Sequence, residues 1–123
     1  MNTQENNKLI ADFMGVRNID DTKYIETLKE MRADGLYFEQ GYMTSELKYD
    51  TDWRWLMEVV EKIERLGFTV EKNFQPIDND WQCLVVKGND ILFQEFNEQS
   101  IQAMHYVVSE FIEWYNLNNL KNS

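Results

Sequence analysis

The sequence predicts a single α+β domain in which an antiparallel sheet is flanked by helices. Two observations support this fold class. Apolar residues in two segments, residues 53–66 and 98–117, recur at the three- to four-residue spacing of amphipathic helices. Between these segments lie three runs with the alternating pattern of strands, separated by turn-forming residues. A chain of 123 residues fits one domain of ordinary size, so we assign residues 1–123 to it.

The composition supplies enough apolar material for one core. Hydrophobic residues make up 43% of the chain, and glycine and proline are scarce. Cys83 is the single cysteine, so no disulfide forms within the chain, and we expect a reducing, cytoplasmic environment. The first eight residues are polar, unlike a secretory signal, and nowhere do 18 apolar residues follow one another as in a membrane span.

Two shorter segments precede the central helix. The apolar residues of residues 5–14 share one helical face, with Thr3 as a candidate N-cap and Gly15 after the last turn. Such a short helix needs a larger surface on which to dock. Residues 21–33 fit a helical stripe less clearly, and aromatic and β-branched residues indicate two short extra strands within residues 36–49.

The central helix has the clearest pattern. A run of Asp, Thr and Asp at residues 50–52 offers a cap and favourable charge at its N-terminus, and Gly67 ends it. Its apolar stripe consists of Trp53, Leu56, Met57, Val60 and Ile63. On the outer face we expect two ion pairs between residues four apart, namely Glu58–Lys62 and Glu61–Arg65.

Three strands follow the central helix. Residues 68–74 alternate apolar and polar side chains, Pro76 interrupts the pattern, and residues 81–86 and 91–96 resume it. Residues 87–90, Lys-Gly-Asn-Asp, have the composition of a hairpin turn. The three strands are therefore expected to form an antiparallel meander.

The last helix is expected from about Glu98 to about Leu117. Asn97 is its candidate cap, and the apolar residues between these limits form a core-facing stripe. The polar residues 118–123 are expected to form a frayed tail.

Negative charge is unevenly distributed along the chain. The formal net charge is −10, and residues 73–119 carry seven acidic side chains, one basic one and eight aromatic ones. Such a surface repels nucleic acid and anionic lipid and attracts a positively charged protein. We therefore expect a protein partner with a basic surface and no direct contact with nucleic acid or membrane. The expected binding residues are Asp78, Asp80, Asp90, Glu95, Glu110 and Glu113, with Trp55 and Trp114 as apolar anchors.

The tryptophans have an alternative interpretation as packed residues. Trp53 and Trp55 begin the central helix on different faces, while Tyr106 and Trp114 lie off the centre of the last stripe. An exposed tryptophan suits a protein interface. For Trp53 and Trp55 we favour packing of both, one of them under the N-terminal helix.

Two residues raise the question of thiol chemistry. His105, the only histidine, lies at the flank of the last stripe, which is typical of a boundary residue. Cys83 lies on a strand that the last helix would cover, so His105 could approach it as a base. We favour a buried, inert thiol.

Acidic residues raise the question of metal-dependent chemistry. Glu46-Leu-Lys48, with Asp34 upstream, matches half of the acid-x-Lys pattern of metal-dependent nucleases, but the Pro-Asp that usually precedes it is missing. The three aspartates at 78, 80 and 90 are expected to crowd two neighbouring loops, without the spacing of a calcium loop. We predict no catalytic residue, no metal and no cofactor.

Three blocks of the chain carry a resemblance to a known family. They are NKLIADFMG at residues 7–15, YDTDWRWLMEVVEKIE at residues 49–64 and VVSEFIEWYN at residues 107–116, together roughly a third of the chain. In this order they resemble small phage and prophage proteins of the phage ABA sandwich family, with Asp-Trp-x-Trp-Leu-Met as the most specific part. The resemblance implies a sheet flanked by helices and an origin in a phage or another mobile element. It supplies no activity or catalytic residues, and residues 18–48 depart from the pattern.

These observations favour a non-enzymatic binding module. A small acidic protein of phage type suits an inhibitor of a bacterial defence system, such as a nucleic-acid-guided nuclease, in the host cytoplasm. One alternative is a phage accessory protein that binds another phage protein or self-associates, so that both a monomer and a homodimer remain open. The other is an enzyme, either a nuclease at Glu46 and Lys48 or a thiol enzyme at Cys83 and His105.

Overall fold

The fold is the predicted α+β domain with a three-stranded antiparallel meander. The structure, a computed structural model, describes residues 3–16, 18–19 and 42–121, so the predicted helical segment 21–33 lies outside the described residues. The described elements are, in chain order, α1 (Thr3–Met14), β1 (Asn18–Ile19), β2 (Tyr42–Met43), the 3₁₀ turn η1 (Thr44–Glu46), α3 (Trp53–Arg65), β3 (Thr69–Gln75), β4 (Asp80–Lys87), β5 (Asp90–Asn97) and α4 (Ser100–Lys121). β4 lies between β3 and β5 and pairs with both in antiparallel register.

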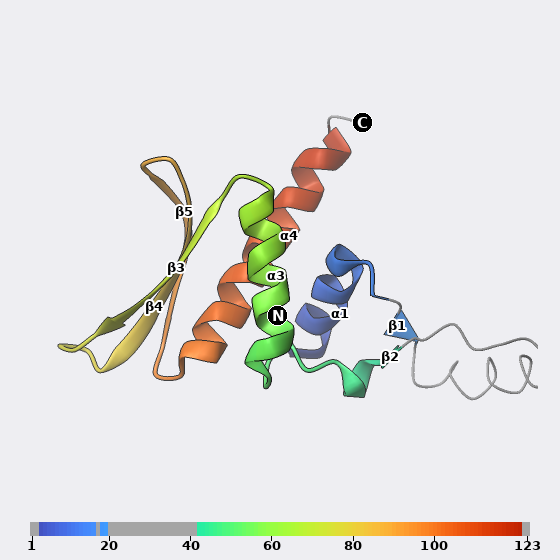
Figure 1. Ribbon diagram of the computed structural model, residues 1–123, viewed down its shortest axis with the longest axis horizontal. Coiled ribbons are helices and arrows are strands. Elements are labelled where there is room, and N and C mark those ends of the chain that lie inside the picture. Colours follow the sequence, from blue (N-terminus) through green and yellow to red (C-terminus); the bar gives the residue numbers. More distant parts are fainter. Residues whose placement is uncertain (1–2, 17, 20–41, 122–123) are drawn as a thin grey trace, which may run out of the picture.

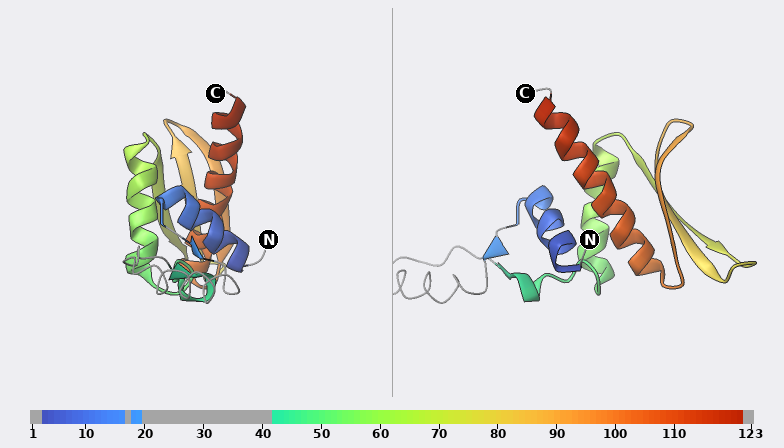
Figure 2. Two further views of the ribbon diagram at one scale, coloured as in Figure 1. Left: turned by 90° about the vertical axis from the view of Figure 1, so that its right-hand side faces the viewer. Right: turned by 180° about the vertical axis from the view of Figure 1, so that it is seen from behind.

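The described helices lie on one side of the sheet (Figure 1). α4 packs across β4 and β5, α3 packs against β3, and α1 packs on α4 and α3 from the other side. The view from behind shows the same order of layers: the sheet, then α3 with α4, then α1 (Figure 2, right). The core that joins these layers includes Ile10, Phe13, Leu56, Ile63, Cys83, Val85, Val107 and Phe111.

Two glycines end helices as the sequence predicts. Gly15 after α1 and Gly67 after α3 have φ angles of 71° and 100°, in the left-handed region that favours glycine. After α3, the N–H groups of Gly67 and Phe68 donate to the carbonyls of Glu64 and Ile63 at 3.0 and 3.5 Å, the pattern of a Schellman motif. Each glycine therefore satisfies helix carbonyls while turning the chain toward the next element.

The N-terminal caps agree with the predictions in part. Asp52 caps α3, because its side chain accepts from the backbone N–H of Arg54 at 2.9 Å. Asn97 accepts from the N–H of Gln99 at 3.0 Å just before α4 begins. Thr3 is the first residue of α1 rather than its cap.

The sheet register determines which side chains face the helices. Cys83 lies opposite Lys72 and Glu95, and Val85 lies opposite Val70 and Phe93. Since Cys83 and Val85 belong to the core, their cross-strand partners share the helix-covered face. On the other face, three glutamine side chains form a hydrogen-bonded row, from Gln75 to Gln82 at 3.3 Å and from Gln82 to Gln94 at 3.0 Å.

Three details differ from the prediction. α4 continues to Lys121, so residues 118–121 are helical rather than a frayed tail. Of the two strands expected within residues 36–49, the described part holds β2, which pairs in parallel with β1 and is followed by η1. Lys62 does not pair with Glu58; its ammonium group donates to the carbonyl of Phe13 and lies 4.3 Å from the centre of the Phe13 ring, whereas Glu61 and Arg65 do pair, at 3.5 Å.

Candidate functional site

The three loop aspartates do not lie together. Asp78 and Asp80 lie at the turn between β3 and β4, while Asp90 begins β5 after the hairpin at the other end of β4. An eight-residue strand such as β4 is about 23 Å long, so the expectation that these residues crowd neighbouring loops is wrong. Asp78 and Asp90 are exposed, and Asp80 is half-buried. They mark the two ends of the sheet with negative charge.

Three other predicted acids do come together, and we call Glu95, Glu110 and Glu113 the acidic cluster. Glu95 lies on the helix-covered face of β5, and Glu110 lies on α4 above it. Both line a cavity of about 330 Å³, together with Asn6, Tyr106 and Ser109. Glu113 follows one turn later on α4 and is exposed. The contact between β5 and α4 thus places carboxyl groups 15 residues apart in sequence beside each other.

The acidic cluster changes the protonation of Glu110. Burial, a hydrogen bond with Glu95 and the negative charges of Glu95 and Glu113 raise the pKa of Glu110 from 4.5 to about 8. At neutral pH the Glu110 carboxyl therefore keeps a proton. In the described part of the chain, no lysine or arginine forms an ion pair with the cluster. Glu110 Oε1 and Asn6 Oδ1 are buried there without a hydrogen-bond partner, so the cavity holds polar atoms whose capacity is unused.

Trp114 packs at the edge of the core and does not protrude from the surface. It is half-buried, and its ring centre lies 6.0 Å from that of Phe68, 6.0 Å from that of Phe93 and 5.9 Å from that of Phe111. These contacts bridge α4, the segment before β3, and β5. Only part of the ring remains for a partner to contact.

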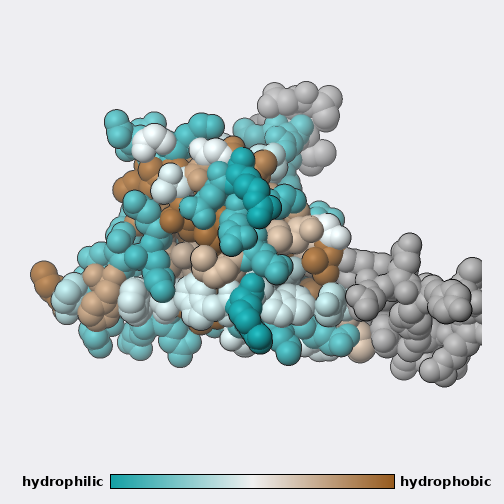
Figure 3. Space-filling model, viewed as in Figure 1, coloured by the Kyte–Doolittle hydropathy of each residue, from teal (hydrophilic) through white to brown (hydrophobic). Residues whose placement is uncertain are grey.

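Trp53 and Trp55 both pack against the core, as favoured above, and the cavity beside Trp55 is also lined by Val16, which follows α1. Trp53 borders an apolar groove between α3 and the sheet, where Met57 is 42% exposed and the Lys72 ammonium lies 4.8 Å from the Trp53 ring centre. Hydrophilic residues cover most of the face shown in Figure 3, and the hydrophobic ones gather near where α3 meets the sheet. Trp55 lies on another side of α3, beside two tyrosines.

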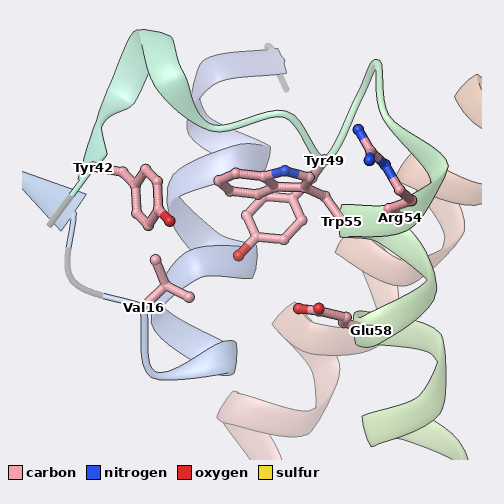
Figure 4. A pocket seen from close by; sticks show the side chains of 6 residues that line it. All are labelled: Val16, Tyr42, Tyr49, Arg54, Trp55 and Glu58. Carbon is pink, nitrogen blue, oxygen red and sulfur yellow. The ribbon is translucent and has the colours of Figure 1, made fainter. Parts of the chain in front are cut away.

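The surroundings of Trp55 form a cavity that sequence patterns did not indicate. It has a volume of about 410 Å³ and is lined by Val16, Tyr42, Tyr49, Arg54, Trp55 and Glu58 (Figure 4). Its walls come from the residue Val16 just after α1, from β2, from the loop after η1 and from α3. The available signal was local: Trp55 and Glu58 are three residues apart and share a face of α3. The tyrosines, by contrast, reach this face only through the tertiary fold.

Cys83 and His105 occupy separate environments that suit structural roles. Burial raises the pKa of the Cys83 thiol to about 11, and its Sγ donates a weak hydrogen bond to the Ser100 carbonyl at 3.7 Å. His105 Nε2 donates to Asn7 Oδ1 at 2.8 Å, since the amide nitrogen of Asn7 is itself the donor to Leu47 O and Asp50 Oδ1 at 3.3 and 3.0 Å. His105 therefore ties α4 to α1 and, through Asn7, to the loop before α3.

The residues of the nuclease-like pattern are occupied in local structure or lie elsewhere. Glu46 accepts a hydrogen bond from the backbone N–H of Met43 at 2.9 Å, and Lys48 is exposed. Asp34 lies outside the described residues. Within residues 3–16 and 42–121, no group of three or more His, Cys, Asp or Glu side chains is arranged to hold a metal ion, and no described helix is long and apolar enough to cross a bilayer.

Comparison with known proteins gives no relative. No protein-family model, no curated protein and no solved structure matches the chain.

Proposed function

We propose that this protein is a non-enzymatic binding module that engages a basic surface of a nucleic-acid-handling protein and thereby inhibits a bacterial defence system. The acidic cluster is the observation that carries the proposal. Glu95, Glu110 and Glu113 lie together, and in the described part of the chain no cationic side chain compensates them. Burial of Glu110, its hydrogen bond with Glu95 and the neighbouring negative charges raise its pKa to about 8, so the free protein holds an extra proton at neutral pH. When a lysine or arginine of the partner approaches, its positive charge would stabilise the ionised Glu110 carboxylate, so the proton would be released.

The wider charge distribution supports the same kind of partner. A formal net charge of −10 gives the chain a long-range attraction to a basic surface, and the aspartates at both ends of the sheet extend the negative region beyond the cluster. Such complementarity chiefly raises the rate of association and weakens with salt. Surfaces that bind DNA or RNA are basic, which makes nucleic-acid-handling proteins the natural class of partner.

The bacterial target is supported by sequence alone. The three blocks that resemble phage and prophage proteins indicate a mobile element, and a mobile element meets the defence systems of its host. The proposed mode of inhibition is occupation of the basic groove, or of a surface beside it, that would otherwise bind nucleic acid. Catalysis by the inhibitor has no part in this mode.

The test is affinity capture from a bacterial host lysate, followed by mass spectrometry. The wild-type protein should retain one basic nucleic-acid-handling protein at about 0.1 M salt and lose most of it at about 0.5 M, where exposed charges are strongly screened. The charge-reversed variant Glu110→Lys/Glu113→Lys should lose the partner at both salt concentrations. The matched control Glu61→Lys/Glu64→Lys, which reverses two exposed acids of α3, should retain most of it. Equal capture by both variants would contradict the proposed role of the cluster.

Self-association is the second candidate, and one observation favours it. Phe96 is 50% exposed and Ile91 55% exposed on β5, beside the glutamine row of the face that the described helices leave uncovered. A phage accessory module could pair through this face. Light scattering at increasing protein concentration separates the two candidates: a constant monomer mass favours the inhibitor, and a concentration-dependent dimer favours the accessory module.

A further inference from the structure

The cavity beside Trp55 has the composition of a cation-binding site. Three aromatic rings border it, Tyr42, Tyr49 and Trp55, and a carboxylate, Glu58, lies at the same opening. Figure 4 shows the Glu58 carboxylate on the side of the two tyrosine hydroxyl groups, with the Arg54 guanidinium on the far side of the indole ring. We propose that this cavity binds the guanidinium group of an arginine side chain presented by a protein partner.

The ring geometry provides the apolar part of the site. The ring centre of Trp55 lies 5.1 Å from that of Tyr42 and 5.2 Å from that of Tyr49, with interplanar angles of 76° and 79°. Both phenol rings therefore make T-shaped contacts with the indole ring. The electron-rich faces of such rings attract cations, and indole attracts them most strongly. Tyr49 is only 2% exposed, so it supports the indole ring from within the core. Tyr42, which is 38% exposed, and the half-buried Trp55 are the rings that a ligand can contact.

The charges around the cavity favour a positively charged ligand. Glu58 forms no ion pair in the described part of the chain, since Lys62 turns to the carbonyl of Phe13. Arg54 does not neutralise it either, because the Arg54 guanidinium holds both carboxylate oxygens of Asp52 at 3.3 and 3.0 Å. Burial and the charge of Glu58 raise the pKa of Tyr49 to about 12, so the phenol keeps its proton at neutral pH. The carboxylate of Glu58 remains available for a ligand.

Arginine fits this arrangement better than the other cations that proteins present. Its planar guanidinium can stack on an aromatic ring while its edge donates two parallel hydrogen bonds to a carboxylate. A lysine ammonium cannot stack in this way, and a trimethylammonium group cannot donate hydrogen bonds to Glu58. The inference goes beyond the proposed function, because this cavity lies at α3 and β2 rather than at the acidic cluster on β5 and α4.

The experiment is a titration of the ¹⁵N-labelled full chain followed by NMR. The probe is the capped peptide acetyl-Gly-Arg-Gly-amide, and its neutral isostere with citrulline in place of arginine is the matched ligand control. The arginine peptide should give saturable shifts of the Trp55 indole N–H and of backbone amides around Glu58, and the citrulline peptide should give none. Glu58→Gln should weaken binding about tenfold, through loss of the charge-assisted bonds. Glu61→Gln removes the same charge from the next turn of α3 and should leave the affinity unchanged.

Several outcomes would overturn the assignment. Equal shifts with the citrulline peptide would exclude charge recognition, and an unchanged affinity in Glu58→Gln would exclude the carboxylate as a ligand. Tighter binding of the same capped peptide with trimethyllysine in place of arginine would assign the cavity to a different cation. Shifts confined to residues around Glu110 would assign the arginine to the acidic cluster instead. The peptide titration tests only the cavity beside Trp55, and the capture experiment with Glu110→Lys/Glu113→Lys tests only the acidic cluster. A negative result in one experiment therefore does not decide the other.

Discussion

Replacing Glu110 with glutamine should change how the stability of this protein depends on pH. In the folded state the Glu110 carboxyl has a pKa of about 8, against an ordinary value of 4.5 that we assign to the unfolded chain. Between these two pH values the unfolded chain has lost a proton that the folded protein keeps. The free energy of unfolding therefore falls as the pH rises through this window and levels off above it. Glutamine cannot titrate, so the variant should not show this part of the decrease.

The size of the effect follows from the position of the carboxyl group. In a fully buried site, a shift from 4.5 to about 8 would correspond to roughly 5 kcal/mol. Glu110 is only partly buried, and solvent screens its interactions with Glu95 and Glu113. We therefore expect a much smaller gain of about 1 to 2 kcal/mol for Glu110→Gln above pH 8. Below pH 4.5 the difference between the two proteins should disappear, because wild-type Glu110 is then protonated in both states.

Urea denaturation at a series of pH values from about 4 to 9 measures this directly. Glu64→Gln is the matched control, because it removes an exposed acid from a different helix, α3. Its difference from wild type should show no comparable rise between pH 4.5 and 8. The electrostatic reasoning would be refuted if Glu110→Gln differed from wild type by the same amount at every pH. It would also be refuted if wild type were the more stable protein at high pH.

Four further measurements test the core and the buried polar groups. Phe111→Ala should lower the free energy of unfolding, measured in urea, by about 3–5 kcal/mol, because Phe111 is fully buried against four aromatic rings: Phe13, Phe68, Trp114 and Tyr115. The control Phe96→Ala, at a side chain that is 50% exposed, should cost less than about 1 kcal/mol. Similar losses for the two variants would contradict the assigned core. Asn7→Ala should cost about 2–3 kcal/mol, since it leaves His105 Nε2 and the Leu47 carbonyl without their partner. Burial lowers the pKa of His105 below 6.5, so wild-type stability should fall as the pH drops through 6.5, and His105→Gln should lack this decrease. Iodoacetamide should leave Cys83 unlabelled in the native protein and label it in urea, because the thiol is 0% exposed and its pKa is about 11. Rapid labelling of the native protein would contradict this, and would show that β4 opens or that the thiol is activated.

The local elements could be predicted from the sequence because their causes are local. The alternation in residues 68–74, 81–86 and 91–96 predicts β3, β4 and β5 to within one residue at each end. Gly67 stops α3 because glycine tolerates a φ of 100°, which is a property of the residue and needs no tertiary contact. α4 continues beyond the predicted end at Leu117, since polar composition alone does not end a helix that is already formed over 18 residues.

Pairings between distant residues could not be predicted in this way. Helical spacing allows Glu58 and Lys62 to pair, but Lys62 finds the Phe13 carbonyl, 49 residues away, once α1 docks on α3. The same limit applies to Glu95 and Glu110, whose contact depends on how α4 is rotated over β5. The separation of Asp78 from Asp90 is a different kind of error. Successive turns of a meander lie at opposite ends of the middle strand, so the predicted topology already excluded one shared loop cluster.

The position of Trp55 changes what kind of contact the protein can make. A tryptophan that protrudes inserts into a pocket of its partner, but Trp55 is half-buried and forms the wall of a recess. The acidic cluster also borders a recess, with Glu110 Oε1 and Asn6 Oδ1 buried at its edge. In both proposals, the site on this protein therefore receives side chains of the partner rather than supplying its own. We expect the partner to contribute protruding cationic residues, so truncating its arginines should weaken the complex more than truncating any one tryptophan of this chain.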